Sequence, residues 1–266
     1  VGAPGVVEAP YSHDDNLHYE QLEDERVDLS NPATLMAVSQ SGLPGAQLPS
    51  SATAGVLTTR AAGQAFFRAG TNRRMLRFTA MNYLCRDLEQ LKDTTRPTDR
   101  IRQDVSRSPG GDSSVFLNSC SGCHSGMDPL AQAFAYYEWD ADDERVVYTA
   151  GEVQDKYFIN SGAFPLGYVT PDATWTNYWR NGPNAALGWD GGSGEGSGAK
   201  SLGREIGSTR AFAVCQVEKV FAQTCLRGVS SQDDRDEVER IADVFEANNR
   251  SMKRVFAEVA AVCMGE

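Results

Sequence analysis

The chain has 266 residues and a formal net charge of −11, because 36 Asp and Glu outnumber 25 Lys and Arg. Such an acidic chain repels phosphates, which excludes duplex nucleic acid as an expected partner. It contains no apolar run of about 18 residues, so we predict no transmembrane segment, and we expect an export signal to have been removed already.

The first segment in chain order, residues 1–30, is polar and acidic, and we predict that it forms an extended arm. Asn31 and Pro32 are typical of an N-cap and a first helical position, so a helix start is expected there. A stretch rich in Gly, Pro and Ser over residues 41–51 then breaks this helix. We expect residues 31–266 to form a single domain.

Helical periodicity next appears over residues 58–68 and 72–92. In the second of these segments Met81, Cys85, Leu88 and Leu91 recur at steps of four and three residues, which predicts one apolar face. Residues 94–112 are rich in Arg, Pro and Gly and are predicted to form a loop.

The most specific pattern is the pentapeptide CSGCH, which runs from Cys120 to His124. Two thiols three residues apart lie on one side of a helical turn, where they can form thioethers to the two vinyl groups of a haem. The adjacent His124 can then give its imidazole to the iron. We therefore predict one covalent haem c and treat His124 as the proximal iron ligand.

Two other readings of this pentapeptide are weaker. A redox-active C-x-x-C pair needs no His and normally follows a βαβ pattern, which is absent here. A zinc site needs further Cys or His ligands at matching spacing, and the other histidines are His13 and His18 in the acidic arm.

The distal ligand of the iron is not fixed by the motif. Met127 follows His124 on the same helix face and is predicted to pack at the haem edge. Met81 is our first choice, because it shares a predicted apolar face with Cys85. The alternatives are Met75, Met252, His18, His13 and a vacant or water-bound site. We expect a six-coordinate, low-spin iron, since His/Met and His/His ligation are the usual arrangements.

Charged residues near the motif suggest two further roles. Among the arginines of the preceding loop, Arg107 is a candidate partner of a haem propionate, with a solvated basic loop as the alternative. The acidic residues after the motif are either solvated charge or a calcium site, although their spacing does not match an EF-hand. They are Asp140, Asp142, Asp143 and Glu144.

The second half of the chain changes character twice. Residues 145–200 hold short aromatic and Gly-rich segments, which we interpret as a long irregular insertion of loops and short strands. Helical patterns return over residues 201–227, 233–248 and 251–263. The predicted fold class is mainly α, a cytochrome c-like haem-binding helical domain with this aromatic and Gly-rich insertion.

Four of the six cysteines lie outside the pentapeptide. An even remainder predicts two disulfides in an oxidising compartment, with four free buried thiols as the alternative. Haem attachment to C-x-x-C-H also takes place outside the cytoplasm. We therefore expect a periplasmic, extracellular or cell-surface protein.

The segment CSGCHSGMDPL, followed by AFAYYEWD, resembles the domains of unknown function in large haem-containing proteins of planctomycetes and myxobacteria. The resemblance extends discontinuously over residues 55–264, through GVLTTR, the helix ending YLC, FAVCQVEKVF and SMKRVF. Two features depart from that family: Ala131 replaces a frequent Gly, and the segment 145–200 is longer and more aromatic.

This resemblance implies haem attachment at Cys120 and Cys123 with His124 on the iron. It also favours a Cys85–Cys215 disulfide, which leaves Cys225 to pair with Cys263. The family has no settled activity, so the resemblance supports the cofactor and the fold better than it supports a functional role.

The leading functional hypothesis is single-electron transfer with a redox partner protein, for which a basic partner would suit the acidic surface. A haem-bearing subunit of a larger exported or surface assembly, including a homo-oligomer, is the second hypothesis. A haem enzyme such as a peroxidase is the third.

Overall fold

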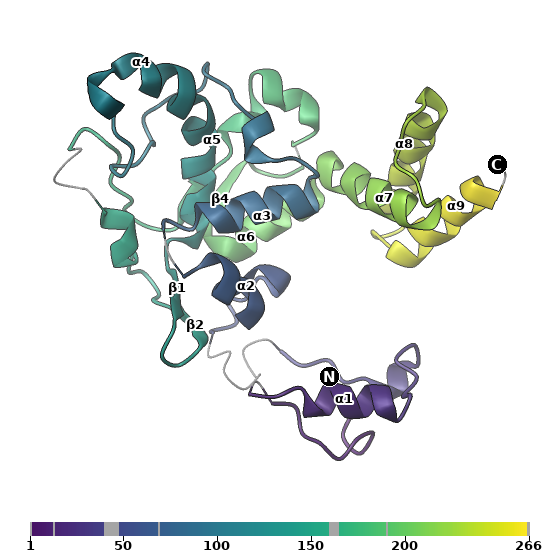
Figure 1. Cartoon of the computed structure of the whole chain (residues 1–266). Coiled ribbons are helices and arrows are strands. Elements are labelled where there is room, and N and C mark those ends of the chain that lie inside the picture. The colour runs from purple at the N-terminus through teal and green to yellow at the C-terminus, as the bar shows by residue number, and fades with distance from the viewer. Residues whose placement is uncertain are drawn as a thin grey trace. The chain divides into compact units, whose positions relative to one another are not determined.

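The computed structural model describes residues 2–12, 14–39, 48–68, 70–159, 165–189 and 191–264. Within these residues the chain is mainly helical with a few short strands, which confirms the predicted mainly α class (Figure 1). Contacts divide it into two compact units. Unit 1 comprises residues 1–68 and 137–148, and unit 2 comprises residues 69–136 and 149–266.

Unit 1 combines two short helices with a β-hairpin. Its elements are α1 (Leu17–Asp24), α2 (Arg60–Phe66), β1 (Tyr137–Asp140) and β2 (Arg145–Tyr148). The strands pair antiparallel with Tyr137 opposite Tyr148. Residues 1–30 are therefore not extended throughout, because α1 forms inside them and buries His18 and Leu22. The helix start expected at Asn31 is a single 3-10 turn, Pro32–Thr34.

Unit 2 contains the CSGCH segment and most of the helices. Its elements are α3 (Arg73–Tyr83), α4 (Ser113–Val115), α5 (Ser121–Ala131), β3 (Thr174–Thr176), β4 (Glu195–Ser197), α6 (Gly198–Ser208), α7 (Arg210–Thr224), α8 (Gln232–Ala247) and α9 (Met252–Met264). Strands β3 and β4 pair antiparallel, and the described residues between them form loops and two 3-10 turns, Tyr178–Arg180 and Pro183–Leu187.

The helix predicted over residues 72–92 ends earlier than expected, at Tyr83. Cys85 adopts a left-handed backbone with φ of 52°, which no helix continues through. Asp87 then caps a separate 3-10 turn, Leu88–Gln90. The predicted apolar face is consequently split: Leu88 is buried, whereas Met81 is 47% exposed.

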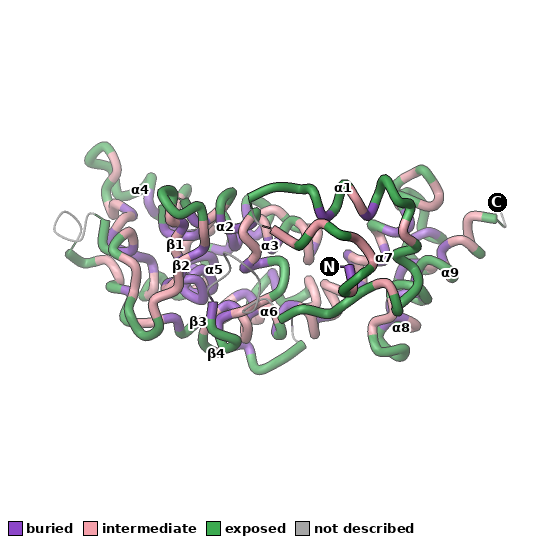
Figure 2. Tube along the Cα trace, turned by 90° about the horizontal axis from the view of Figure 1, so that it is seen from below, coloured by how far each residue is buried: buried purple, intermediate pink, exposed green. Residues whose placement is uncertain are grey.

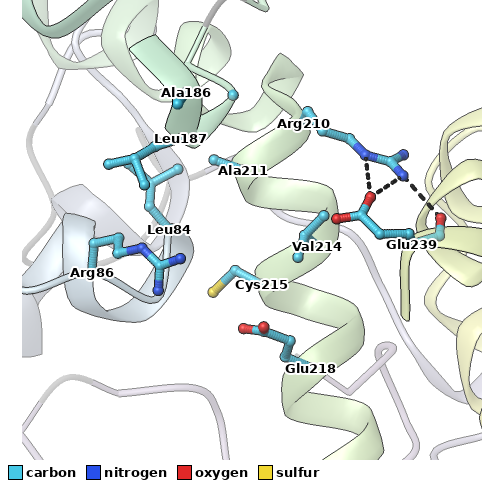
Figure 3. Close-up of a pocket in the computed structure, with 11 residues that line it drawn as sticks. Leu84, Arg86, Ala186, Leu187, Arg210, Ala211, Val214, Cys215, Glu218 and Glu239 are labelled. Atoms are coloured by element: carbon cyan, nitrogen blue, oxygen red, sulfur yellow. Dashed lines mark hydrogen bonds and ion pairs between the residues drawn. The ribbon is translucent and has the colours of Figure 1, made fainter. Parts of the chain in front are cut away.

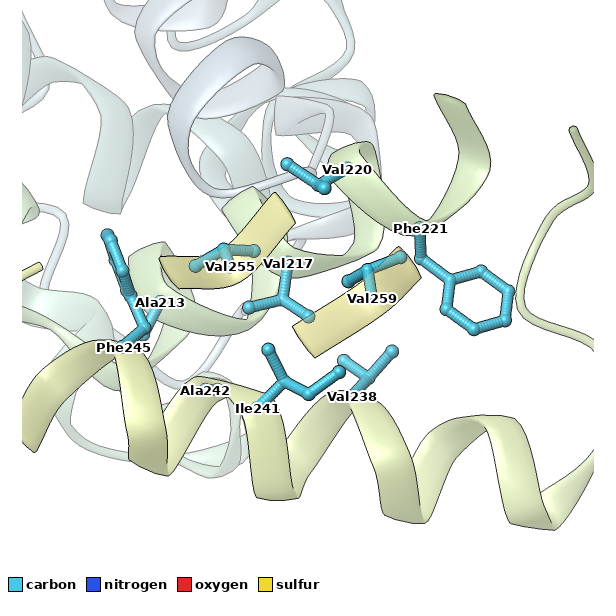
Figure 4. Close-up of a cluster of buried hydrophobic side chains, with 10 residues drawn as sticks. All are labelled: Ala213, Val217, Val220, Phe221, Val238, Ile241, Ala242, Phe245, Val255 and Val259. Atoms are coloured by element: carbon cyan, nitrogen blue, oxygen red, sulfur yellow. The ribbon is translucent and has the colours of Figure 1, made fainter. Parts of the chain in front are cut away.

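The last three helices form a bundle with its own apolar core (Figure 4). The helix predicted over residues 201–227 is divided at Thr209, whose hydroxyl accepts the N–H of Phe212 at 3.1 Å and so caps α7. Both predicted disulfides are present: Cys85–Cys215 ties the end of α3 to α7, and Cys225–Cys263 joins α7 to α9.

Helix α5 lies in the interior of unit 2, where it packs against α3 and β3 (Figures 1 and 2). It continues through Pro129 to Ala131, although a proline inside a helix often interrupts it. A proline in the last turn removes one backbone hydrogen bond, and buried contacts on either side hold the helix. Separately, none of the helices in the described ranges has both the length and the apolarity needed to span a membrane.

Candidate haem site

The CSGCH segment forms the junction of two kinds of helix. A π-helical turn, Phe116–Cys120, leads directly into α5, so that Cys120 is the N-cap and Cys123 and His124 lie in the first turns. π-Turns widen the helix and are frequent at functional sites. With residues at i, i+3 and i+4 on one face of a helix, both thiols and the imidazole point to the same side.

Exposure of α5 is confined to this face. Every residue of the helix is buried except Cys123 and His124, and Cys120 just before it is also partly exposed. Burial of the rest of the helix fixes its position in unit 2. The two thiols and the imidazole are thus presented at the surface of unit 2 by a rigid support.

Both thiols are available for covalent attachment. All six cysteines lie in the described part of the chain, and Cys120 and Cys123 are the two that form no disulfide. Burial raises the pKa of the Cys123 thiol, an effect that Lys92 opposes, so this side chain stays protonated at neutral pH.

The His124 imidazole is oriented by Asp128, one helical turn further along α5. Its Nδ1 lies 3.1 Å from Oδ1 of Asp128, and an ionised carboxylate only accepts, so Nδ1–H donates. This fixes the tautomer and leaves Nε2 with its lone pair free to bind iron.

Asp128 is in turn held by two arginines from other parts of unit 2. Its side chain is fully buried, and Arg73 donates to both carboxylate oxygens, at 2.7 Å from Nε and 2.9 Å from Nη2. Arg102 lies over the ring of Tyr157 and contributes its backbone N–H to Asp128 at 3.1 Å. Oδ1 of Asp104 accepts a further hydrogen bond from Nη2 of Arg73 at 2.8 Å.

These contacts determine the charge of Asp128. Burial on its own would raise the pKa of the carboxyl, but the guanidinium groups of Arg73 and Arg102 hold it well below its usual range. The same burial raises the pKa of Tyr157 to about 12. The group next to His124 is therefore a permanent, fully paired carboxylate.

Arg107, the predicted propionate partner, lies beside the motif. Its guanidinium packs over the ring of Phe116 at 4.8 Å and donates to the carbonyl oxygens of Ile101 and Val105. Ile101, Val105 and Phe116 form a small apolar cluster on which Cys120 also packs. Burial lowers the pKa of Arg107. Its contacts place it near Cys120, and the propionate role stays a prediction.

The methionines considered as iron ligands have different surroundings. Met127 is buried on α5, and its packing at a haem edge stays a prediction; Met75 on α3 is fully buried. Met81, also on α3, is 47% exposed. Met252 begins α9, which packs against α7 and α8.

His18 belongs to unit 1, where both of its ring nitrogens are already used. Nε2 accepts the backbone N–H of Gly2 at 3.1 Å, and Nδ1 lies 2.8 Å from the carbonyl oxygen of Ala9. These contacts give the imidazole a structural role inside unit 1. His13 lies outside the described residues.

The acidic cluster considered for calcium forms the turn of the β1–β2 hairpin. Oδ1 of Asp140 accepts the backbone N–H groups of Asp142 and Asp143. Arg145 pairs with Asp143, and Arg60 donates to Glu144. In the part of the chain that the structure describes, no three His, Cys, Asp or Glu side chains converge as a metal site.

A pocket of about 180 Å³ lies next to the Cys85–Cys215 disulfide (Figure 3). Small organic ligands usually occupy pockets of about 300–1,000 Å³. Two of the charged side chains that line it are already paired with each other, because Arg210 donates to Glu239. Burial raises the pKa of Glu218 here. We do not assign a ligand to this pocket.

The donor set at α5 fits a covalent haem. Two free thiols and one imidazole with Nε2 free share a partly exposed face, whereas a closed zinc site would require four ligands. The contacts of Asp128 with Arg73 and Arg102 were not found from the sequence. A carboxylate four residues after His124 was the available signal. In comparisons with family models, curated proteins and solved structures, nothing matched the chain.

Proposed function

We propose that the chain is a monohaem c-type cytochrome that transfers single electrons outside the cytoplasm. The main observation in support of this proposal is that helix α5 is buried along its length except at Cys123 and His124. Cys120, just before the helix, is also partly exposed. A helix that exposes only the residues able to attach a haem and bind its iron is suited to this cofactor.

Each residue of this face has a distinct role in the proposal. A haem bound here would supply a reversible one-electron couple. Cys120 and Cys123 would fix its edge to α5, and His124 would give Nε2 to the iron. Asp128 holds the imidazole in the required tautomer. Because α5 is otherwise buried, these side chains are held rigidly. A rigid site suits electron transfer, because it reorganises little when the iron changes its oxidation state.

Two other features support export and a protein partner. The disulfides Cys85–Cys215 and Cys225–Cys263 are typical of oxidising compartments. The net charge of −11 favours association with a basic redox protein, with rates that fall as salt is added.

The first test is haem attachment. The chain, directed to the periplasm of a bacterial host with a c-type haem maturation system, is expected to retain haem on a denaturing gel. The Cys120→Ala/Cys123→Ala double variant is expected to lose this signal completely, because no thioether can form. The Cys225→Ala/Cys263→Ala variant, produced in the same host, serves as the matched control and is expected to retain haem. A haem-free wild-type protein would refute the proposal.

We further propose Met81 as the distal ligand. A large apolar side chain that is 47% exposed is available to be covered by a haem. Met81 lies on α3, the helix that packs against α5, and α5 carries His124. Met75 would have to leave the core, and His18 would have to give up its hydrogen bonds.

Met81→Ala is expected to convert the ferric protein from a low-spin to a high-spin visible spectrum, since the iron loses its strong-field sixth ligand. Met252→Ala, at a comparably exposed methionine, is expected to keep the wild-type spectrum. A Met81→Ala protein with an unchanged low-spin spectrum would exclude Met81 and leave the other candidates.

A further inference from the structure

We propose that Asp128 is a positioning residue that lowers the reduction potential of the iron through His124. Arg73, which binds the same carboxylate, opposes this effect. This inference rests on the proposed haem function and goes beyond it, because it assigns the control of potential to a buried ion network rather than to the axial ligands. The network joins α3, the loop before the motif and α5.

The geometry gives the carboxylate two different partners on its two sides. Toward the site, Oδ1 of Asp128 accepts from Nδ1 of His124 at 3.1 Å. Away from it, Arg73 binds both carboxylate oxygens, and Nη2 of Arg102 lies 3.6 Å from Oδ1. The Asp128 side chain is fully buried and the Arg102 side chain is 1% exposed, so water screens this pair only weakly.

A carboxylate that accepts the Nδ1–H of a metal-bound imidazole increases the electron density at Nε2. A more electron-rich ligand stabilises the ferric state over the ferrous state, and the reduction potential falls. Arg73 opposes this effect, because it draws the negative charge of Asp128 away from the imidazole. The two side chains are therefore expected to shift the potential in opposite directions when each is replaced.

The experiment measures reduction potentials of haem-loaded full-length variants by spectroelectrochemical titration. Asp128→Asn keeps an oxygen near Nδ1 but removes the charge, and the potential is expected to rise. Replacing a residue that hydrogen-bonds to a metal ligand typically changes metal affinity or activity by about 10–100-fold. A tenfold change in the one-electron equilibrium is about 59 mV, and we expect a rise of at least that size.

Two control carboxylates separate this effect from simpler ones. Asp104→Asn removes the same charge from the same network without touching His124, and its shift is expected to be smaller. Asp234→Asn disrupts another arginine-paired carboxylate, held by Arg227 at the start of α8, and the potential is expected to stay unchanged.

Loss of Asp128 also leaves two arginines without their buried partner, which can prevent folding. Arg73→Gln is therefore the second test variant. It removes the positive charge that draws the negative charge of Asp128 away from His124, and the reduction potential is expected to fall. Arg77→Gln, one turn further along α3 and paired with Asp87, removes an equal charge as its control.

The inference is overturned if Asp128→Asn shifts the potential no more than Asp104→Asn, or if Arg73→Gln lowers it no more than Arg77→Gln. Haem attachment is scored separately on the denaturing gel. A wild-type protein without haem refutes the proposed function, whereas loaded variants with unchanged potentials refute this inference alone.

Discussion

Replacing Cys85 and Cys215 together by alanine is expected to lower the free energy of unfolding by about 5 kcal/mol. The disulfide joins residues 130 positions apart, so it restricts a large part of the unfolded chain, and the entropy of loop closure gives this magnitude. Urea denaturation of the wild type and the variant at the same pH measures the loss.

The second disulfide is the matched control for this prediction. Cys225 and Cys263 are 38 positions apart, and the same relation gives about 4 kcal/mol for their replacement by alanine. The variant without Cys85–Cys215 should therefore be the less stable of the two by about 1 kcal/mol. A loss below about 1 kcal/mol for Cys85→Ala/Cys215→Ala would show that this bond does not secure the end of α3 on α7.

Gly126→Ala is expected to destabilise the protein by about 1–3 kcal/mol, even though alanine is the better helix former. A Cβ at position 126 would lie 2.1 Å from Cε2 of Trp179. Trp179 is fully buried and meets Trp189 edge to face, so the indole has no room to withdraw. Thermal or urea unfolding measures the effect.

Gly207→Ala in α6 isolates the contribution of helix propensity. A Cβ at position 207 meets no atom within 4 Å, and the residue lies inside a helix. This variant is expected to be more stable than the wild type by about 0.5–1 kcal/mol. If Gly126→Ala were equally stabilising, Trp179 would not pack against α5 as the structure has it.

The parts of the fold that follow from local sequence were predicted well. Helices α6, α8 and α9 are amphipathic, and the structure adds a break at Thr209, which is itself a good N-cap residue. The disulfides Cys85–Cys215 and Cys225–Cys263 followed from resemblance to a family rather than from spacing, which leaves three pairings open.

The errors arise where tertiary structure overrides local pattern. The periodicity over residues 72–92 continues past Tyr83, but Cys85 bonds to α7 and adopts a left-handed backbone, so the helix ends. Met81 lies inside α3 but off its buried face, which is formed by Met75, Leu76, Thr79 and Ala80.

The candidate site was only half predictable for the same reason. Cys120, Cys123 and His124 are adjacent in sequence, and their spacing encodes their chemistry. Asp128 contacts Arg73 and Arg102, which are 55 and 26 residues away, and only folding brings these charges together. The sequence alone does not distinguish a buried carboxylate from an exposed one.

The most direct test of the central claim is the reduced pyridine haemochrome spectrum of the protein matured in a periplasm. We predict an α band at the position typical of haem with both vinyl groups converted to thioethers, in a ratio of one haem per chain. A band at the position of unmodified protohaem, or no haem at all, would contradict covalent attachment through Cys120 and Cys123.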